Sequence, residues 1–457
     1  MNLGIALLAA SLLLGGCAST SAKPAFDEVA RTVQTRSGHS VRWNQQRAED
    51  EQAERAIDTL LQRELSVDAA VQVALLANPE LQAELEELAI SQADLVQAGL
   101  LRNPVFGIGR TAWEMEHIVP NLFATLEMEF IDLLTLPLKK RVSATQLEAT
   151  KLEVGDHVLE FAASVRHAYY ETQAAEQLLA LRELVEQAAA ASAELAKQQH
   201  AAGNMNDLAL NTELSLAAQT TLDKQRAQGD AATTREALNK RMGTWGKRTA
   251  WRLPTKLAPL PKEEPTLDRL ESVAIAQRLD VAAARRNVQA MDYGLSLAKT
   301  TRWTGTVNVA VEAGRLRGSK RLAFGPSVAL EIPLFDQRQA QIAKLEAYQR
   351  QAEHRLRALA IDVRADVRAS RARVSTARAV VEQYGNVIVP LREKIVQVSQ
   401  QHYDAMLLGV YQLIQAKQSE YEAYREYIEA LRDYWIAKSE LERVVGVRTG
   451  HQHGEKP

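Results

Sequence analysis

The spacing of apolar residues changes in the same order in both halves of the chain. Apolar positions recur with a helical period over 67–101 and over 142–202, where almost no helix-breaking residue occurs. Between these stretches, at 103–132, the period falls to two, as in a β-hairpin. The second half repeats the order, with a hairpin at 304–334 and a helical stretch at 337–405. This pattern predicts a mainly α-helical chain with long helical hairpins and four β-strands.

Acidic residues alternate with apolar ones in the predicted strands. They are Glu127, Glu129, Glu312 and Glu331. Strands of about nine or ten residues with this alternation are typical of a membrane β-barrel. A carboxylate that faces lipid costs of order 1 to 3 kcal/mol, so we expect these four side chains to face an aqueous lumen. There they either favour cations at a pore mouth or simply solvate a polar lining. Four strands cannot close a barrel, which takes about eight, so several copies must share one.

The two halves also match in sequence, which predicts an internal repeat. Met242-Gly243 corresponds to Val445-Gly446, and an offset of about 200 residues persists between the halves. The predicted division is a signal peptide at 1–17, an N-terminal extended segment at 18–64, a first repeat at 65–244, a Pro-rich linker at 245–265, a second repeat at 266–446 and a flexible tail at 447–457. Within the repeats we expect helical tips at 203–207 and 405–411. Gly385 and Pro390 predict a kink or a register change in the second long helix.

Composition narrows the classes of protein that remain. The chain has 457 residues, 46% hydrophobic and 25% charged, and its 55 basic side chains nearly balance 57 acidic ones. This balance argues against a nucleic-acid partner, which favours a basic surplus. A single cysteine excludes an intrachain disulfide and a thiolate zinc cluster.

That cysteine, Cys17, ends an apolar run at 3–16. A run of roughly a dozen apolar residues is too short for a membrane-spanning helix and is typical of a signal peptide. The sequence Leu14-Gly15-Gly16-Cys17 resembles a bacterial lipobox, in which the cysteine is acylated and becomes the mature N-terminus. The interpretation implies a lipid-anchored envelope protein of a Gram-negative bacterium, and Ala18 favours its outer membrane. The alternative is a structural cysteine in a buried helix.

Several short motifs, in their order and spacing, resemble the TolC family of outer-membrane efflux proteins, including its lipidated, RND-associated branch. They are Leu65-Ser66-Val67-Asp68-Ala69-Ala70 before Asn78-Pro79-Glu80-Leu81, then Leu330-Glu331-Ile332-Pro333-Leu334-Phe335-Asp336, then Tyr403-Asp404-Ala405 before Leu408-Gly409-Val410-Tyr411-Gln412-Leu413. The resemblance implies a homotrimer with a twelve-stranded barrel in the outer-membrane lipid and an α-helical barrel that extends into the periplasm. It also implies a periplasmic adaptor (a membrane fusion protein) at the tips and an inner-membrane pump of the RND type.

The resemblance places adaptor docking and the gate at the helical tips. The residues concerned are Gly203, Asp207, Leu208, Gly409, Gln412 and Gln415. Many relatives carry two aspartates where this chain has Gln412 and Gln415, a difference that argues against an electrostatic cation gate at this level. Asp207 is the remaining acidic candidate, or else the N-cap of a helix. We expect Gly203 and Gly409 to supply positive φ or a close approach.

The turn between the last two strands is cationic, with Arg315, Arg317, Lys320 and Arg321. It is either an extracellular loop that meets lipopolysaccharide phosphates or an ordinary soluble turn. His451 and His453 form a His-x-His pair in the tail, but ligand spacing for a structural metal site is absent from the sequence. We find no sequence pattern of a catalytic triad, a phosphate loop or a metalloprotease, so we expect no enzyme and no cofactor.

The leading hypothesis is therefore a passive outer-membrane channel of a tripartite efflux system, whose cargo is heavy-metal cations or small toxic organic molecules. One alternative is the outer-membrane conduit of type I secretion. The other is a lipid-anchored periplasmic coiled-coil scaffold without a pore.

Overall fold

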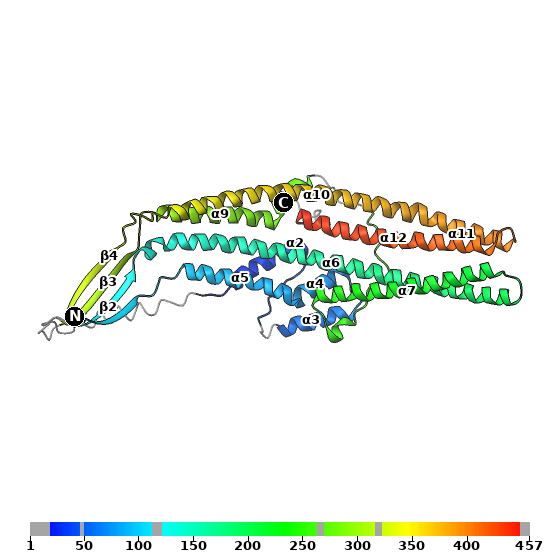
Figure 1. Ribbon diagram of the computed structural model, residues 1–457, viewed down its shortest axis with the longest axis horizontal. Helices are drawn as coiled ribbons and strands as arrows, with labels where there is room; N and C mark the ends of the chain where they lie inside the picture. The colour runs from blue at the N-terminus through cyan, green and yellow to red at the C-terminus, as the bar shows by residue number, and fades with distance from the viewer. Residues whose placement is uncertain (1–18, 46–49, 112–120, 263–268, 316–321, 448–457) are drawn as a thin grey trace, which may run out of the picture. The chain divides into compact units, whose positions relative to one another are not determined.

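The computed structural model describes residues 19–45, 50–111, 121–262, 269–315 and 322–447. The chain divides into two compact units. Figure 1 labels many of the helices and strands that make them up. Unit 1 is built from Met1–Glu28, Glu86–Val154 and Asp280–Leu359, and unit 2 from Val29–Leu85, Gly155–Leu279 and Ala360–Pro457. Several long helices pass from one unit into the other, so each unit draws on both halves of the sequence.

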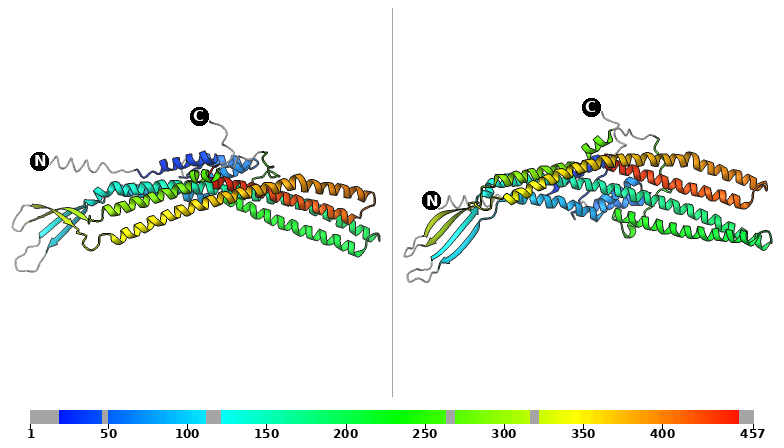
Figure 2. Two further views of the ribbon diagram at one scale, coloured as in Figure 1. Left: turned by 90° about the horizontal axis from the view of Figure 1, so that it is seen from above. Right: turned by 45° about the horizontal axis from the view of Figure 1, so that its top comes forward.

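Unit 1 contains a single four-stranded antiparallel sheet in the described residues, in the order β1-β2-β3-β4. Its strands are β1 (Val105–Thr111), β2 (Asn121–Glu129), β3 (Val307–Arg315) and β4 (Leu322–Leu330). The two hairpins lie side by side because β2 pairs with β3, with Thr125 opposite Glu312 (Figure 2). The four strands predicted from the alternation are therefore confirmed.

Helices continue from the same end of the sheet within unit 1. They belong to α5 (Pro79–Ala98), α6 (Ile131–Ala201), α9 (Leu279–Thr300) and α10 (Gln339–Gln383). Arg141 of α6 donates to the hydroxyl of Tyr293 on α9 at 2.8 Å, and Lys299 of α9 pairs with Glu346 of α10 at 2.8 Å. Polar contacts of this kind tie neighbouring helices together along their flanks.

Unit 2 holds both helical tips. Its helices include α4 (Val67–Ala77), α7 (Asp207–Met242), η1 (Gly246–Thr249), α8 (Leu270–Gln277), α11 (Val389–Asp404) and α12 (Val410–Val445). Trp251 holds the segment after α7 in place. Its buried indole N–H donates to Asn239 Oδ1 at 2.8 Å, and the Arg235 guanidinium lies 3.8 Å from the centre of its ring. No helix in the described part of the chain has a stretch long and apolar enough to cross a membrane.

The first predicted helix, at 67–101, is two helices in the structure. Asn78 separates α4 from α5 with an extended backbone, because the residue before a proline disfavours helical angles. The Asn78 side chain uses both of its polar atoms there. Its Oδ1 accepts from the Leu81 amide at 3.1 Å, and its Nδ2 donates to the carbonyls of Lys240 and Arg241 at the end of α7.

The register change expected near Gly385 and Pro390 is confirmed. A short π-helix, η2 (Tyr384–Ile388), joins α10 to α11. The Val389 N–H donates to the Tyr384 carbonyl five residues earlier, which is the spacing of a π-helix. Pro390 lies in the first turn of α11, where its missing N–H costs little.

The prediction that 18–64 is an extended segment is wrong for much of its length. It contains α2 (Lys23–Ser37) and α3 (Asp50–Gln62). Val29 and Val33 of α2 and Ile57 of α3 are buried, which gives each helix an apolar contact that its polar composition conceals. In the described part of this segment, 38–45 follows α2 without regular structure.

Side-chain amides from α4 and α5 hold that irregular stretch in place within unit 2. The amide of Gln72 bonds to both the N–H and the carbonyl of Ser40, at 3.1 and 2.8 Å. Gln82 bonds in the same way to the Asn44 N–H and the Arg42 carbonyl, at 2.7 and 2.9 Å. Each glutamine replaces the partner that a neighbouring strand would provide.

Two glycines with positive φ offer a matched test of this packing. Gly243 (φ 67°) ends α7, and a Cβ there would lie 2.8 Å from the Asn78 Cα, whereas Gly203 (φ 77°) would meet nothing within 4 Å. We expect Gly203→Ala to cost about 1 kcal/mol from its backbone angle, and Gly243→Ala about 1–3 kcal/mol more from overpacking. The measurement is the thermal unfolding midpoint followed by far-UV circular dichroism. Equal shifts for the two variants would contradict the close packing of Gly243.

Candidate functional site

The two faces of the sheet differ in chemistry. Residues opposite each other in an antiparallel pair place their side chains on the same face. The register therefore groups Thr125, Glu127, Glu129, Asn308, Glu312 and Ser327 on one face, together with small residues such as Gly107, Gly325 and Ala329. Val105, opposite Glu127, and Phe123 are large apolar exceptions on this face. Phe123 covers Gly109, where a Cβ would lie 2.4 Å from its ring.

The opposite face is mostly apolar, with Arg110 opposite Leu122 as an exception, and many of its large side chains are exposed in the single chain. Its exposed members are Phe106, Ile108, Leu122, Leu126, Met128, Val309, Val311, Leu322, Phe324, Val328 and Leu330. Soluble surfaces rarely expose a contiguous apolar area of this extent, so such a face is expected to contact another apolar phase or partner.

The sheet brings the predicted acidic residues together on its polar side. Glu127, Glu129 and Glu312 share that face. Arg102 pairs with Glu129 at 2.6 Å, so this carboxylate is already balanced. Glu331 lies beyond the end of β4 and accepts from the Thr306 N–H and hydroxyl, both at 3.0 Å, which lowers the pKa of its carboxyl. That this face lines a lumen stays a prediction.

Several predicted site residues lie outside the described ranges. They are Cys17, Arg317, Lys320 and Arg321, together with the tail residues His451 and His453. Of the cationic turn, only Arg315 is placed, as the last residue of β3 opposite Leu322.

The first tip joins α6 to α7 through a turn that requires a left-handed residue. The Asn204 N–H donates to the Gln199 carbonyl and the Gly203 N–H to the His200 carbonyl, both at 2.9 Å. This pair of bonds is the Schellman arrangement, and Gly203 supplies its positive φ as expected.

Asn206, not Asp207, caps α7. The Asn206 side chain accepts from the Ala209 N–H at 2.9 Å and its backbone is extended. The alternative interpretation of Asp207 as an N-cap is therefore wrong, because the preceding asparagine already holds that place. Asp207 is the first residue of the helix, and its exposed carboxylate lies 2.8 Å from His200 Nε2.

The second tip uses the same turn with different residues. Leu407 donates to the His402 carbonyl at 2.8 Å and Met406 to the Tyr403 carbonyl at 2.9 Å. Met406 takes the positive φ, at 59°, although it is not a glycine. Gly203 and Met406 therefore occupy equivalent places, and the same offset pairs Gln199 with His402.

Gly409 does not supply a positive φ, contrary to one of the two roles expected of it. Its φ is −79°, and it precedes α12 as the cap residue. The side chain of Gln412 accepts from the Gly409 N–H at 2.9 Å, so this glutamine closes the start of α12. A Cβ at Gly409 would lie 2.8 Å from that side-chain oxygen, so the glycine does allow a close approach.

The tips present apolar side chains next to an amide-lined groove. Leu208 is 78% exposed, Leu407 75% and Met406 93%. A groove of about 930 Å³ lies between α7 and α12. Its walls include Leu208, Leu216, Tyr411, Ile414, Gln415 and Gln418. The surface is suited to an apolar and hydrogen-bonding partner rather than to a charged one.

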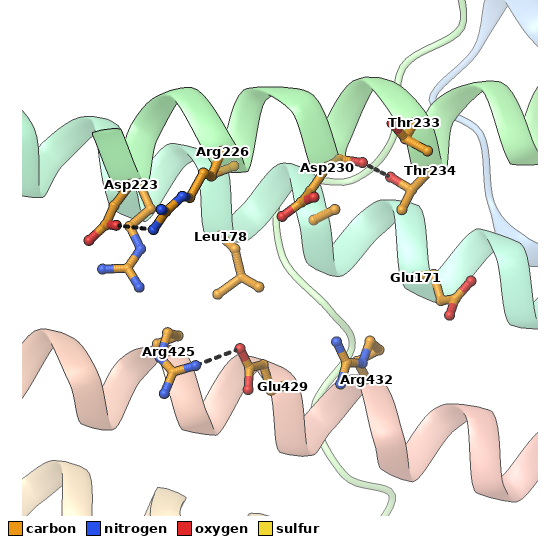
Figure 3. A pocket seen from close by; sticks show the side chains of 13 residues that line it. Glu171, Leu178, Asp223, Arg226, Asp230, Thr233, Thr234, Arg425, Glu429 and Arg432 are labelled. Carbon is orange, nitrogen blue, oxygen red and sulfur yellow. Dashed lines mark hydrogen bonds and ion pairs between the residues drawn. The ribbon is translucent and has the colours of Figure 1, made fainter. Parts of the chain in front are cut away.

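A second groove, of about 460 Å³, is charged (Figure 3). Asp223, Arg226 and Asp230 of α7 line one wall, and Arg425 and Glu429 of α12 lie across from them. The ion pairs drawn stay within a wall, Arg226 with Asp223 at 3.6 Å and Arg425 with Glu429 at 3.1 Å. Charges that are balanced within their own helix are typical of a solvated face. In the described residues, no group of three or more His, Cys, Asp or Glu side chains is arranged to hold a metal ion.

Sequence reasoning missed three features of these surfaces. Met406 was not singled out because its left-handed turn lacks the usual glycine signal. Arg102 bridges Glu129 and Asp132, at 2.6 and 2.9 Å, but these partners are distant in sequence. Phe335 is 91% exposed, and its place in the motif at 330–336, at the end of a strand, was the only available signal.

Comparison with known proteins supports the fold strongly and at low sequence identity. No protein-family model and no curated protein sequence matches the chain. Among solved structures, the outer membrane protein VceC of Vibrio cholerae superposes with a TM-score of 0.70 at 16% identity, covering 83% of this chain and 96% of VceC. The CmeC outer membrane channel of Campylobacter jejuni gives 0.68 at 14% identity, with 85% and 87% coverage. The MtrE outer membrane channel of Neisseria gonorrhoeae, in its open state, gives 0.65 at 15% identity, with 83% and 89% coverage.

The chain thus has the fold of these solved outer-membrane proteins. These structural neighbours are TolC-family channels, so the TolC-like fold that the sequence motifs indicated is confirmed.

The cap at the first tip can be tested directly. We expect Asn206→Ala to lose about 1 kcal/mol of local stability, which corresponds to roughly fivefold faster amide hydrogen exchange in the first turn of α7. Asn206→Asp keeps a capping oxygen and should exchange like the parent, and the amides of the second tip serve as an internal control. A larger effect from Asp207→Ala than from Asn206→Ala would contradict this assignment.

Proposed function

We propose that the chain is the outer-membrane channel of a tripartite efflux system. In this proposal three copies form one passive conduit from the periplasm to the exterior. A periplasmic adaptor and an RND-type inner-membrane pump open the conduit at its helical tips. The chain itself carries out no chemical reaction.

The single observation that carries the proposal is the sheet. One face is apolar and exposed, the other is polar and bears Glu127, Glu129 and Glu312. Strands of nine residues, as in β2, β3 and β4, suit the thickness of a bilayer. In lipid, the outer edges of β1 and β4 would leave backbone groups unpaired, which only a closed sheet prevents. Three copies supply twelve strands, in which β4 of one copy pairs with β1 of the next.

The long helices support oligomerisation independently. Leu184 and Leu195 on α6, Ile361 on α10 and Leu391 on α11 are all at least half exposed in the single chain. Helices of this length need neighbours along their apolar stripes, and neighbouring copies in an α-helical barrel would provide them.

The tips support the adaptor part of the proposal. Leu208, Met406 and Leu407 project apolar side chains, and Gln415 lines the groove between α7 and α12. We place adaptor docking there, with Gly203, Asp207, Gly409 and Gln412 shaping the turns. Because glutamines stand at the gate level, docking is proposed to act through packing and hydrogen bonds more than through charge.

The lipid anchor, the extracellular loop and the cargo are proposed from the sequence alone. Acylated Cys17 would anchor the chain to the outer membrane, and Arg315, Arg317, Lys320 and Arg321 would form an extracellular loop. Heavy-metal cations or small toxic organic molecules are the proposed cargo. A type I secretion conduit would share the same channel, whereas a periplasmic scaffold would form no pore.

Adjacent residues on opposite faces of β4 test the channel. Val328→Glu puts a carboxylate on the apolar face in each copy, at a cost of about 1–3 kcal/mol per site, whereas Ser327→Glu adds one to the polar face. We expect Val328→Glu to lose the heat-modifiable trimer band and channel conductance in planar bilayers. Ser327→Glu should keep both and increase cation preference. Equal tolerance of the two variants, or a parent that forms no channel, would remove the proposal.

The same pair of variants tests efflux in cells. Deleting the gene should sensitise the host to the cargo, tested with copper, zinc and cobalt against dyes and antibiotics. Ser327→Glu should restore resistance and Val328→Glu should not. Loss of polypeptide secretion with unchanged resistance to every compound would favour the type I secretion alternative.

A further inference from the structure

One stretch of unit 2 concentrates a positive charge that the chain as a whole lacks. Residues 240–256 carry six basic side chains and no acidic one, whereas the two signs nearly balance over the full sequence. The six are Lys240, Arg241, Lys247, Arg248, Arg252 and Lys256. A local surplus of this kind attracts anions to the surface that carries it.

Part of this stretch forms one wall of a groove of about 850 Å³, which we call the basic groove. The opposite wall is the end of α3 together with the two residues that follow this helix. Four basic and two acidic side chains line the groove. They are Arg63, Lys247, Arg248 and Arg252, with Asp58 and Glu64.

Two contacts fix the walls of the basic groove relative to each other. The Arg248 guanidinium pairs with Glu54 at 2.6 Å and with Asp58 at 2.8 Å, and both carboxylates belong to α3. The Leu65 N–H donates to the Arg252 carbonyl at 2.7 Å, so the chain after α3 runs beside the chain after η1. The charge of Arg248 is therefore neutralised within the groove, and this arginine holds η1 against α3.

The other three cations of the groove are not used by the fold in this way. Arg63, Lys247 and Arg252 have exposed side chains, and none of them forms an ion pair with another described residue. Glu64 is exposed beside them and likewise lacks a basic partner among the described residues. Three unpaired cations thus accompany one unpaired carboxylate, which leaves the groove with a positive charge that an anionic ligand could neutralise.

An exposed tryptophan stands next to the basic groove. Trp245 is 83% exposed and precedes Lys247 by two residues, across the turn that Gly246 makes with a φ of 59°. The Arg248 N–H donates to the Trp245 carbonyl at 3.3 Å, which ties this residue to η1. An indole presents a broad rigid face and one N–H donor, a combination that suits the C–H face and hydroxyls of a sugar ring.

We propose that the basic groove binds a carboxylate-bearing glycan. Arg63, Lys247 and Arg252 hold its carboxylates through charge-assisted hydrogen bonds, and Trp245 stacks on one of its sugars. The inference rests on the proposed function for its location, because that function puts unit 2 in the periplasm. The glycan there is peptidoglycan, whose peptide stems carry free carboxylates beside the sugars. The groove attaches the channel to the cell wall.

The lining of the groove argues against a phospholipid. Its large apolar residues Trp251 and Leu253 are buried, and Leu61 is half-buried, so acyl chains find little exposed apolar surface there. An acidic protein segment would neutralise the three cations but would leave the exposed face of Trp245 without a sugar to stack on. The test below separates it from a glycan.

Co-sedimentation of the full-length protein with purified peptidoglycan sacculi tests the inference. The groove variant replaces the three unpaired cations by glutamine, as Arg63→Gln, Lys247→Gln and Arg252→Gln. The matched control variant removes three exposed cations of α10 in the same unit, as Arg364→Gln, Arg371→Gln and Arg373→Gln. Each variant is first checked for the circular dichroism spectrum of the parent.

We expect the groove variant to bind sacculi about tenfold more weakly than the parent, and the control variant to bind like the parent. Converting the carboxylates of the sacculi to amides should weaken binding of the parent in the same way. Trp245→Ala should weaken binding to sacculi about fivefold but leave binding to poly-L-glutamate, which has no sugars, unchanged.

Equal losses in the groove and control variants would overturn the inference, since general charge attraction would explain them. Binding of the parent to poly-L-glutamate but not to sacculi would replace the glycan by an acidic protein segment. A protein that conducts ions in planar bilayers but does not bind sacculi would overturn the inference and leave the channel intact. Binding through the groove by a protein that forms no channel would support the inference and remove the proposed function.

Discussion

Backbone hydrogen bonding at the two edges of the sheet is the constraint on which the rest depends. Inside the order β1-β2-β3-β4 every strand has a neighbour, but among the described residues the outer sides of β1 and β4 have none. In water such edges can bind solvent, whereas in lipid each unpaired group costs several kcal/mol. The exposed apolar face makes water unfavourable for the sheet, and the unpaired edges make lipid unfavourable for a lone copy. Closure by further copies would satisfy both conditions, and the proposed trimer is one such closure.

Backbone hydrogen bonding also determines which polar side chains stand at the helix ends. Asn78 uses its amide nitrogen on the last carbonyls of α7 and its oxygen on the first turn of α5, so one side chain closes two helices. Asn206 and Gln412 cap the helices after the two tips by different means, one accepting from its own helix and the other from the preceding glycine. Many polar groups of the tips form hydrogen bonds within their own turns. Large apolar side chains such as Leu208 and Leu407 are therefore prominent on the exposed surface of the tips.

Local signals in the sequence predicted much of this architecture. The elements that they did not predict were missed for physical reasons. The period-two stretches located all four strands, since alternation directly encodes a two-faced sheet. Gly385 and Pro390 located the π-helix because a missing N–H must shift the hydrogen-bond ladder. The sequence did not predict the helices at Lys23–Ser37 and Asp50–Gln62. Their few buried residues, such as Val33 and Ile57, stabilise these helices only through tertiary contacts.

The candidate sites were less predictable for the same reason. Capping of α7 by Asn206 rather than Asp207 depends on backbone angles, which neighbouring polar residues in a sequence do not distinguish. The positive φ of Met406 appears only in the folded turn. The partners of Arg102 lie on the far side of a hairpin, so spacing along the chain does not reveal them.

A further consequence concerns how stability and function are coupled. The largest apolar surfaces of this chain, on the sheet and on α6, α10 and α11, are exposed in a single copy and would become interior only on assembly and insertion. For such a protein the folded monomer is not the reference state, and association and lipid contact contribute to the free energy of folding. A change that weakens the apolar face therefore acts first on assembly, even when it leaves the hydrogen bonds of the protomer untouched. In the proposed assembly the pore and the stable fold would be a single property, and the charged groove between α7 and α12 could remain solvated without contributing to either.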